Sequence, residues 1–456
     1  MKRTESWFDL VSERKFALLK EELLSLPAPD LAEELSDVPE RYALLFFRLL
    51  PKENAAEVFS YLEKDRRHAL VSAFSDKELR ILTEELFLDD CADLLEEMPA
   101  TVVTRILAAA DPDTRRQLNE LLRYPEDSAG SMMTTEFVML RREMTVAEAF
   151  AKIRKEAIDK ETVYTVYVVD AARRLIGTVS AKELLLASPE KTVGEIYRPN
   201  ALFVNTGDDR EAVARMFDKY DLLALPVADA EGRLVGIVTV DDAIDVLHAE
   251  AEEDFQVMAA ITPTDTPYLR TSTFRLYLAR IPWLAVLLLS ATLTGAIISS
   301  FESALAVSTV LAAFIPMLMG TGGNAGSQAS VVVIRGLSLG EIRPRDALRV
   351  LWKELRVAIL TALTLAILAF AKVVLVDGLL FGSIETHLYE TAFVVAAALL
   401  LTVIAALLIG GLLPVLAKAI HLDPAVMASP FITTIVDAVA LLVYFYIASA
   451  ALLPLL

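Results

Sequence analysis

The chain has 456 residues, of which 55% are hydrophobic, and this share excludes an ordinary soluble protein and places part of the chain in lipid. Its 62 acidic and 43 basic side chains give a formal net charge of −19, all of it in residues 1–275, because residues 276–456 hold nine basic and nine acidic side chains. An acidic half excludes nucleic acid as an expected partner and favours metal ions or basic proteins, unless the charge only serves solubility.

From residues 1–50 we expect no export signal at the N-terminus. Residues 1–50 are charged throughout and lack the apolar core of a signal peptide. Cys91 is the only cysteine, so no disulfide framework is available within the chain, which fits a reducing compartment. We therefore expect the acidic half to lie in the cytosol.

Residues 8–123 read as a series of short amphipathic helices. Acidic and aliphatic residues recur in units that end in proline, such as Asp30–Pro39 and Asp90–Pro99. Short helices separated by proline are typical of a small helical superhelix. The sequence therefore predicts an acidic, all-α superhelical N-terminal domain over residues 1–127.

Residues 128–250 contain an internal repeat. Residues 174–183 align with residues 233–242 at an offset of 59, and each copy predicts a strand, a helix, two strands and a second helix. This tandem α/β unit, 128–191 and 192–247, resembles a pair of CBS domains, modules that often sense adenine nucleotides or metals. Thr239 and Asp242 match the Thr-x-x-Asp that contacts ribose in such modules, whereas the first copy has Ser180 and Glu183. The resemblance implies ATP as a candidate ligand, with an inactive nucleotide site as the alternative.

An acidic run follows the repeat. Residues 241–254 hold seven acids, while the apolar residues Ile244, Leu247 and Ala251 keep helical spacing. Such a run is often only a solvated helix face. Its position directly before the first apolar stretch favours an acidic connecting helix, expected within residues 248–275, that couples the cytosolic half to the membrane.

The last part of the chain predicts a transmembrane domain over residues 276–456. A span needs about 20 apolar residues, and five stretches reach that length. Lys and Arg gather before the first, between the second and third, and between the fourth and fifth, which places the N-terminus in the cytosol and the C-terminus outside. The predicted spans are 281–301, 304–334, 357–376, 391–417 and 426–453.

Two features of the predicted spans carry polar chemistry. Asp437 is the only charged residue after Pro424, and a carboxylate at membrane depth needs a partner or a wet cavity. A glycine-rich segment late in the second span adds neutral oxygen ligands, although small-residue helix packing alone would explain its glycines. Oxygen donors without His or Cys favour a hard cation such as Mg²⁺. The candidate pore residues of this segment are Gly320, Thr321, Asn324 and Gln328.

Several motifs together resemble one family. They are residues 124–130 followed by Met133-Thr134-Thr135, the tandem CBS pair, the acidic connecting helix, residues 322–328 and residues 430–437. Over essentially its whole length the chain resembles the MgtE-type magnesium channels. This resemblance implies a homodimer whose pore lies on the two-fold axis, with Asp437 of each subunit holding a hydrated Mg²⁺ and Asp423 at the intracellular mouth.

The resemblance also implies how such a pore closes. Mg²⁺ would bridge acids of the N-terminal domain, the CBS pair and the connecting helix when the ion is plentiful. The acids expected to bind this regulatory ion are Asp89, Asp90, Asp93, Glu97, Asp245, Glu250, Glu253 and Asp254.

The sequence as a whole predicts a multi-pass protein of the cell (inner) membrane that imports Mg²⁺ down its electrochemical gradient and is gated by cytosolic Mg²⁺. A broader divalent-cation transporter admitting Co²⁺ or Mn²⁺, and a non-conducting Mg²⁺ sensor, are the alternatives. A CBS-regulated anion transporter is disfavoured, because the spans offer no inward-facing Arg or Lys. An enzyme is disfavoured because no nucleophile–base pair, P-loop or zinc spacing is found.

Overall fold

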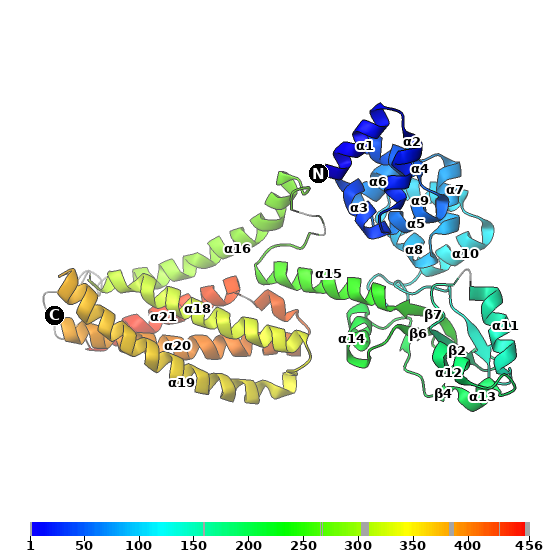
Figure 1. Ribbon diagram of the computed structural model, residues 1–456. Coiled ribbons are helices and arrows are strands. Elements are labelled where there is room, and N and C mark those ends of the chain that lie inside the picture. The colour runs from blue at the N-terminus through cyan, green and yellow to red at the C-terminus, as the bar shows by residue number, and fades with distance from the viewer. Residues whose placement is uncertain are drawn as a thin grey trace. The chain divides into compact units, whose positions relative to one another are not determined.

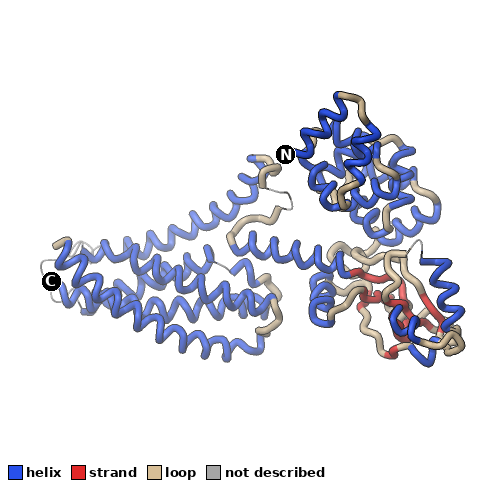
Figure 2. Tube along the Cα trace, viewed as in Figure 1, coloured by secondary structure: helices blue, strands red, loops and turns tan. Residues whose placement is uncertain are grey.

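The computed structural model describes residues 2–157, 160–264, 266, 268–301, 310–382, 387–427 and 429–451. The chain divides into two compact units, Met1–His248 and Ala249–Leu456 (Figure 1). Strands are found only in the first unit, as Figure 2 shows for the described residues. The expected combination of an all-α N-terminal domain, an α/β CBS pair and long C-terminal helices is confirmed.

The first unit begins with a series of short helices. Pro27, Pro39, Pro51 and Pro99 occupy the N-cap positions of four of them, where a missing amide proton costs no helical hydrogen bond. Ser75 caps another in a reciprocal capping box with the N3 glutamate. The helices are α1 (Lys2–Ser12), α2 (Phe16–Leu24), α3 (Ala28–Asp37), α4 (Glu40–Leu49), α5 (Lys52–Ser60), α6 (Lys64–Ala73), α7 (Asp76–Glu85), α8 (Leu88–Glu97), α9 (Ala100–Ala109) and α10 (Pro112–Leu121).

These helices form a superhelix because each packs on the next but one. Helix α3 contacts α5, α5 contacts α7 and α7 contacts α9, while α2 contacts α4 and α4 contacts α6. Their apolar faces meet in a core where Trp7 and Phe46 lie edge to face, with ring centroids 5.7 Å apart. The same core continues through Leu121 of α10 to Val213 and Leu225 of the second CBS copy. The helical domain and the CBS pair are therefore packed together within one unit.

The two CBS copies repeat the same local topology. In each, a short strand pairs in parallel with a second strand, which pairs antiparallel with a third and carries an irregularity at its end, at Val168/Val169 and at Val227/Ala228. The register pairs Tyr167 with Thr178 and Pro226 with Ile237, so the predicted offset of 59 residues holds in space.

The sheets have the orders β1-β2-β3-β4 and β5-β6-β7. Their elements are β1 (Met139–Arg141), α11 (Val146–Glu156), β2 (Thr165–Val169), β3 (Leu175–Ser180), α12 (Ala181–Leu186), α13 (Val193–Ile196), β4 (Arg198–Pro199), β5 (Val204–Asn205), α14 (Arg210–Tyr220), β6 (Ala224–Ala228) and β7 (Leu234–Thr239).

Helix α15 (Val240–Met258) runs from the end of the second CBS copy into the second unit. It begins earlier and ends earlier than the predicted connecting segment 248–275. The described residues from Ala259 to Thr271 are not helical. Pro263 lies in this stretch, and the residue before a proline is biased away from helical geometry.

The second unit is a bundle of long helices (Figure 1). Helix α18 packs on α20 and α21, α19 packs on α20, and α16 packs on α21. The elements are α16 (Thr273–Ser300), α18 (Val310–Ser338), η2 (Pro344–Asp346), α19 (Ala347–Lys372), the π-helical η3 (Val373–Leu380), α20 (Leu388–Ala419), η4 (Pro424–Met427) and α21 (Ser429–Ala451).

By length and composition, the described residues contain four helical stretches able to cross a membrane: Thr273–Ser300, Pro344–Leu380, Leu388–Ala419 and Pro424–Ala451. Helix α18, which covers most of the predicted second span, is not among them because its glycine-rich polar stretch lowers its hydropathy. Parts of two predicted spans, 304–309 and 452–453, lie outside the described residues, as does residue 428.

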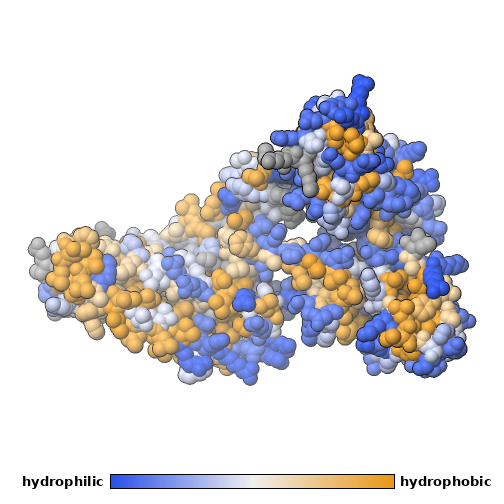
Figure 3. Space-filling view, in the orientation of Figure 1, coloured by the Kyte–Doolittle hydropathy of each residue, from blue (hydrophilic) through white to orange (hydrophobic). Residues whose placement is uncertain are grey.

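Hydrophobic side chains cover much of the visible face of this bundle (Figure 3). Leu288 on α16, and Leu348 and Leu360 on α19, expose 74%, 80% and 71% of their surface. Soluble proteins rarely leave so much apolar surface in contact with water. The bundle is therefore built to face lipid, and the chain is a multi-pass membrane protein.

Candidate metal sites

The glycine-rich part of α18 presents two different faces. Gly322, Gly323 and Gly326 are buried, and a Cβ atom at Gly326 would lie 2.9 Å from a side-chain atom of Ile432. A Cβ at Gly410 of α20 would lie only 2.1 Å from the carbonyl oxygen of Gly326. These glycines let α18, α20 and α21 approach closely, so helix packing explains them.

The opposite face of α18 is polar and exposed. Gly320, Asn324 and Gln328 follow one another at four-residue spacing and point away from the packed helices, and a Cβ at Gly320 would meet nothing within 4 Å. Thr321 lies beside them and is partly buried. Packing within one chain therefore does not account for these amides and this hydroxyl.

Helix α21 packs on the glycine side of α18 and places Asp437 at the same level along the bundle as the polar residues. The hydroxyls of Ser327 and Thr433 are 3.4 Å apart, and the hydroxyl of Tyr444 donates to the carbonyl of Leu311 at 2.9 Å. The two helices are thus antiparallel, which puts Asp437, one turn beyond Thr433, level with the turn around Gly320.

Asp437 is partly buried, and its Oδ1 atom is enclosed without a hydrogen-bond partner among the described residues. Lys372, the basic side chain within the predicted third span, is paired with a different acid. The ammonium of Lys372 lies 2.8 Å from a carboxylate oxygen of Asp377 and 5.5 Å from the ring centroid of Phe314. A buried polar atom without a partner is costly, so this carboxylate is available to a ligand.

Asp423 lies in the connection between α20 and α21. Its carboxylate accepts a hydrogen bond from the backbone amide of Ala425 at 2.8 Å and so caps the short helix η4. The hydroxyl of Ser330 on α18 donates to the carbonyl of Met427 at 3.1 Å, which fixes the end of this connection to the bundle. One oxygen of Asp423 thus has a structural role, and the residue remains exposed.

A second group of carboxylates lies in the first unit, between α8, the start of α15 and the residues before β2. Asp89 is buried, and its nearest charged neighbours include Asp242 and Glu161. Asp90 faces Asp241 and Asp245. We call this group the acidic cluster, and it consists of Asp89, Asp90, Asp93, Glu161, Asp241, Asp242 and Asp245.

Burial and mutual repulsion disfavour negative charge in the acidic cluster. Burial, reinforced by the neighbouring acids, raises the pKa of Asp90 to about 6, of Asp242 to about 7 and of Glu161 to about 8. The same causes hold the pKa of Asp89 well above its usual range. Arg67, the basic neighbour of Asp90, only partly offsets this effect. The cluster therefore stores electrostatic repulsion that a cation would relieve.

The chemistry of the cluster fits a hard cation. All its side-chain donors are carboxylate oxygens, and the Oε2 atom of Glu161 is buried without a partner among the described residues. Within the described part of the chain, no three acidic, His or Cys side chains converge closely enough to form a complete metal site. Mg²⁺ would keep several of its waters in such a site, which loosely spaced carboxylates allow.

The predicted regulatory residues fall into three groups. Asp89, Asp90, Asp93 and Asp245 lie in the acidic cluster. Glu97, on the next turn of α8, is held by Arg67 at 2.8 Å and by Lys64 at 3.6 Å. Glu250, Glu253 and Asp254 belong to the second unit, where Asp254 accepts a hydrogen bond from Ser338 at 3.2 Å. That these last acids act with the cluster stays a prediction.

Sequence reasoning missed Glu161 and Asp241 as members of the cluster. A signal for Glu161 was present in the repeat. The helix N-caps Thr145 and Asp209 are 64 residues apart, whereas the strands that follow begin at Thr165 and Ala224, 59 residues apart. The first copy thus carries five extra residues between helix and strand, and Glu161 lies among them.

The Thr-x-x-Asp of the second copy caps a helix. The hydroxyl of Thr239 donates to Asp242 at 2.6 Å at the start of α15, and Ser180 and Glu183 form the equivalent capping box at the start of α12. Asp242 also faces the acidic cluster. The first-copy motif instead borders a cleft of about 310 Å³ that Arg198 also lines.

Comparison with known protein families finds separate matches for the N-terminal helices, the two α/β repeats and the C-terminal helices. Residues 315–447 match the MgtE family, described as divalent cation transporters, residues 26–127 match the MgtE intracellular N domain, and residues 129–190 and 193–249 each match a CBS domain. A protein named magnesium transporter MgtE from Thermus thermophilus is 40% identical over 434 residues, covering 94% of each chain. One of the same name from Bacillus subtilis is 32% identical and covers 92% of this chain and 91% of its own.

Two solved structures resemble the first unit. The cytosolic domain of the Mg²⁺ channel MgtE in complex with ATP has 40% identity and a TM-score of 0.51, and the match covers 53% of this chain and 98% of that one. The soluble part of a magnesium transporter has 28% identity and a TM-score of 0.51, covering 55% of this chain and 98% of that one.

An apolar helical bundle with a polar face at membrane depth, joined to a CBS pair, defines a multi-pass membrane transport protein. Such a protein moves ions and is not an enzyme. The match over nearly the full length then identifies the family: the chain belongs to the MgtE family of divalent cation transporters.

Proposed function

We propose that this protein is a Mg²⁺ channel that imports the ion down its electrochemical gradient and is closed by cytosolic Mg²⁺. The observation that carries the proposal is the carboxylate oxygen of Asp437 that has no hydrogen-bond partner among the described residues, at the level of the glycine-rich stretch of α18. The magnesium transporters that resemble the chain over more than nine-tenths of its length support the choice of ion.

The pore would form where two copies of α18 and α21 face each other. A C2 homodimer brings two Asp437 carboxylates to one axis, where a divalent ion neutralises both. Gly320, Thr321, Asn324 and Gln328 supply neutral oxygens or space for the ion's waters, and Asp423 would lie at the cytosolic mouth. An inside-negative potential favours entry of a divalent ion by about 4.6 kcal/mol per 100 mV. This direction assumes a cytosolic N-terminus and an external C-terminus.

The acidic cluster would act as the sensor. When it is empty, repulsion between the acids of α8 and those of α15 opposes close docking of the helical domain on the CBS pair. When Mg²⁺ binds, the repulsion is relieved and the docked arrangement is favoured. Because α15 continues into the second unit, this two-state element can bias the pore. Glu97, Glu250, Glu253 and Asp254 are proposed to complete the set of regulatory ligands.

ATP is proposed as a second cytosolic ligand, because a relative's cytosolic domain binds it. Thr239 and Asp242 were the expected contacts, but phosphates there would meet the acidic cluster. The first-copy cleft is the more favourable place, because Arg198 lines it and would bind phosphate in exchange for Glu183, with which it pairs at 2.6 Å beside Ser180. An ATP titration of Arg198→Ala and of Thr239→Ala distinguishes the two clefts, since only one variant should lose affinity.

The function is tested by Mg²⁺ influx into liposomes under an inside-negative potential, with and without Mg²⁺ on the cytosolic face of the protein. Wild type should conduct, and its flux should fall as cytosolic Mg²⁺ rises. Asp437→Ala should abolish the flux, whereas the control Glu390→Gln, which removes an acid at the start of α20, should not.

Competition separates the alternatives. Equal entry of Co²⁺ or Mn²⁺ would favour a broader divalent-cation transporter. A wild type that binds Mg²⁺ but never passes any cation would leave a non-conducting sensor. Normal flux through Asp437→Ala would overturn the pore assignment.

A further inference from the structure

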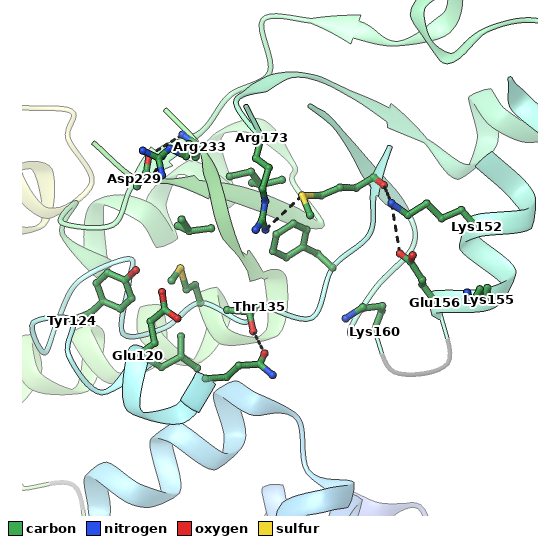
Figure 4. Close-up of a pocket in the computed structure, with 17 residues that line it drawn as sticks. Glu120, Tyr124, Thr135, Lys152, Lys155, Glu156, Lys160, Arg173, Asp229 and Arg233 are labelled. Atoms are coloured by element: carbon green, nitrogen blue, oxygen red, sulfur yellow. Dashed lines mark hydrogen bonds and ion pairs between the residues drawn. The ribbon is translucent and has the colours of Figure 1, made fainter. Parts of the chain in front are cut away.

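A cavity of about 760 Å³ lies in the first unit, away from both the acidic cluster and the first-copy cleft. It is enclosed by α10 of the helical domain, by α11, and by the turns that follow β2 and β6 (Figure 4). Its size suits a small metabolite. Five of its lining residues are basic and three are acidic, so its lining carries a net positive charge in a chain with a net charge of −19.

The basic side chains of this cavity are not equally free. Lys152 donates to the carbonyl of Met139 at 2.7 Å and lies 3.8 Å from Glu156. Arg233 lies 3.8 Å from Asp229. Arg173 contacts only the sulfur of Met139, at 4.0 Å, and among the described residues no carboxylate partner is found for it.

Arg173 and Lys160 both line the cavity, and Figure 4 shows them as separate side chains from two different segments. Lys160 likewise has no carboxylate partner in the described part of the chain. The two side chains come from different segments of the first CBS copy. They therefore offer two cationic groups to whatever occupies the space between them.

Arg173 occupies a position where the other copy has glycine. It lies in the turn between β2 and β3 with a φ of +63°, and the residue 59 positions later is Gly232, with a φ of +76°. A left-handed backbone suits glycine and costs roughly 1–2 kcal/mol for other residues. The first copy thus keeps an arginine at the expense of backbone strain, and strain of this kind is commonly found at functional positions.

Lys160 reaches the cavity through the same five-residue insertion that carries Glu161 into the acidic cluster. The second copy has no equivalent residue, because α14 ends at Tyr220 and β6 begins at Ala224. Both cationic groups are therefore departures from the repeat. The second copy folds without either residue, so folding of the repeat does not explain why both Arg173 and Lys160 line this cavity.

We propose that this cavity binds a small phosphate-bearing anion, held by Arg173 and Lys160. A guanidinium and an ammonium that line one cavity match a phosphate, which accepts several charge-assisted hydrogen bonds. Tyr124 and Phe137 provide an aromatic wall for the uncharged part of the ligand. Cations are disfavoured because the lining is net positive. The site is distinct from the first-copy cleft, where ATP is proposed.

The ligand would join the helical domain to the CBS pair. Tyr124 and Glu120 reach the cavity from the end of α10, and the hydroxyl of Thr135 is 3.0 Å from the side-chain oxygen of Gln117 across the same boundary (Figure 4). Binding of the anion therefore stabilises the docked arrangement of these two parts. The anion would bind at the boundary where the acidic cluster also lies, but it would be held by basic side chains, whereas the cluster would hold a cation.

The test is calorimetric titration of inorganic pyrophosphate into the full-length protein in lipid nanodiscs, with divalent ions removed by EDTA. Arg173→Gly is the main variant, because the second copy shows that glycine suits this turn. It should weaken pyrophosphate binding at least about tenfold while leaving thermal stability unchanged or raised. Lys160→Gln should weaken binding to a similar extent, and Glu120→Gln should tighten it by removing a nearby negative charge.

Two controls make the result decisive. Arg174→Ala changes a neighbouring arginine that does not line the cavity, and Arg198→Ala removes the arginine of the first-copy cleft. Arg174→Ala should bind pyrophosphate as wild type does, and Arg198→Ala should keep the binding event that Arg173→Gly loses. The proposal is overturned if wild type shows no binding at millimolar pyrophosphate, if Arg173→Gly binds normally, or if Arg198→Ala alone loses binding.

Discussion

The two candidate metal sites use negative charge in opposite ways. In the membrane unit, one partly buried carboxylate, Asp437, lies on a helix that packs against closely spaced glycines. In the cytosolic unit, seven acids crowd around a boundary between two domains. A single carboxylate can attract an ion and still release it. In the acidic cluster the carboxylates repel one another, so binding of an ion would draw the helical domain and the CBS pair together. Under the proposed function, this difference assigns conduction to the weakly charged site and sensing to the cluster whose acids repel one another.

The largest expected effect comes from neutralising the membrane carboxylate. Asp437→Asn keeps the side-chain volume but removes the charge that a hydrated cation needs, so Mg²⁺ flux should fall at least about 100-fold, equivalent to roughly 3 kcal/mol. Asn324→Ala, on the adjacent polar face, should lower flux less because it removes a neutral ligand. Liposome influx assays compare the two. Equal losses would show that charge is not what distinguishes this site.

The rigidity of the membrane site is tested next, through the contact between α18 and α20. Gly410→Ala places a Cβ against the carbonyl of Gly326, so it should destabilise the bundle by about 1–3 kcal/mol. The purified protein's thermal unfolding midpoint should fall accordingly. Gly295→Ala in α16 is the matched control, because a Cβ there meets nothing within 4 Å, and its midpoint should not fall. A Gly410→Ala protein as stable as wild type would show that this contact is not tight.

The strain of the cytosolic site can be removed without deleting side chains. Asp90→Asn combined with Asp242→Asn lowers the repulsion in the empty cluster and removes two ligands. The Mg²⁺ concentration that half-closes the channel should rise about tenfold or more. Glu33→Gln, an exposed acid on α3, should leave it unchanged. The sensor assignment fails if the double variant is inhibited by Mg²⁺ as wild type is.

The smallest expected effect is a pH dependence confined to the metal-free cytosolic site. Asp90, Asp242 and Glu161 have folded pKa values of about 6, 7 and 8, above those of free carboxylates. The folded state therefore binds more protons than the unfolded state, and its stability is greatest below about pH 4, where free carboxylates titrate, and falls as pH rises from about 4 to about 8. Without Mg²⁺ the thermal midpoint should drop over this range.

Saturating Mg²⁺ should flatten that pH profile, because the ion replaces the protons. The Asp90→Asn, Asp242→Asn double variant should also show a shallower profile than wild type. A midpoint that rises with pH in the absence of Mg²⁺ would contradict the sign of these pKa shifts.

Local patterns in the sequence predict which helices and strands form and how they are grouped into domains. Helical periodicity with proline punctuation predicts the superhelix, the offset of 59 residues predicts the CBS pair, and apolar stretches of about 20 residues predict the membrane helices. Asp437 stands out because it is a lone acid in such a stretch, and the acids of α8 stand out as a run. These features need only near neighbours along the chain to be recognised.

Contacts between distant segments decide the rest. The sequence alone does not distinguish Gly320, which is exposed, from Gly326, which a neighbouring helix buries, because their local surroundings are alike. It does not bring Glu161 to Asp89, or Arg173 to Lys160, since each pair depends on how a loop of one segment packs against another. Glu97 belongs to the same acidic run as Asp93, yet Arg67 from a different helix binds it instead. Periodicity and composition are local and so determine which elements form, whereas burial, charge pairing and cavities arise only when those elements meet.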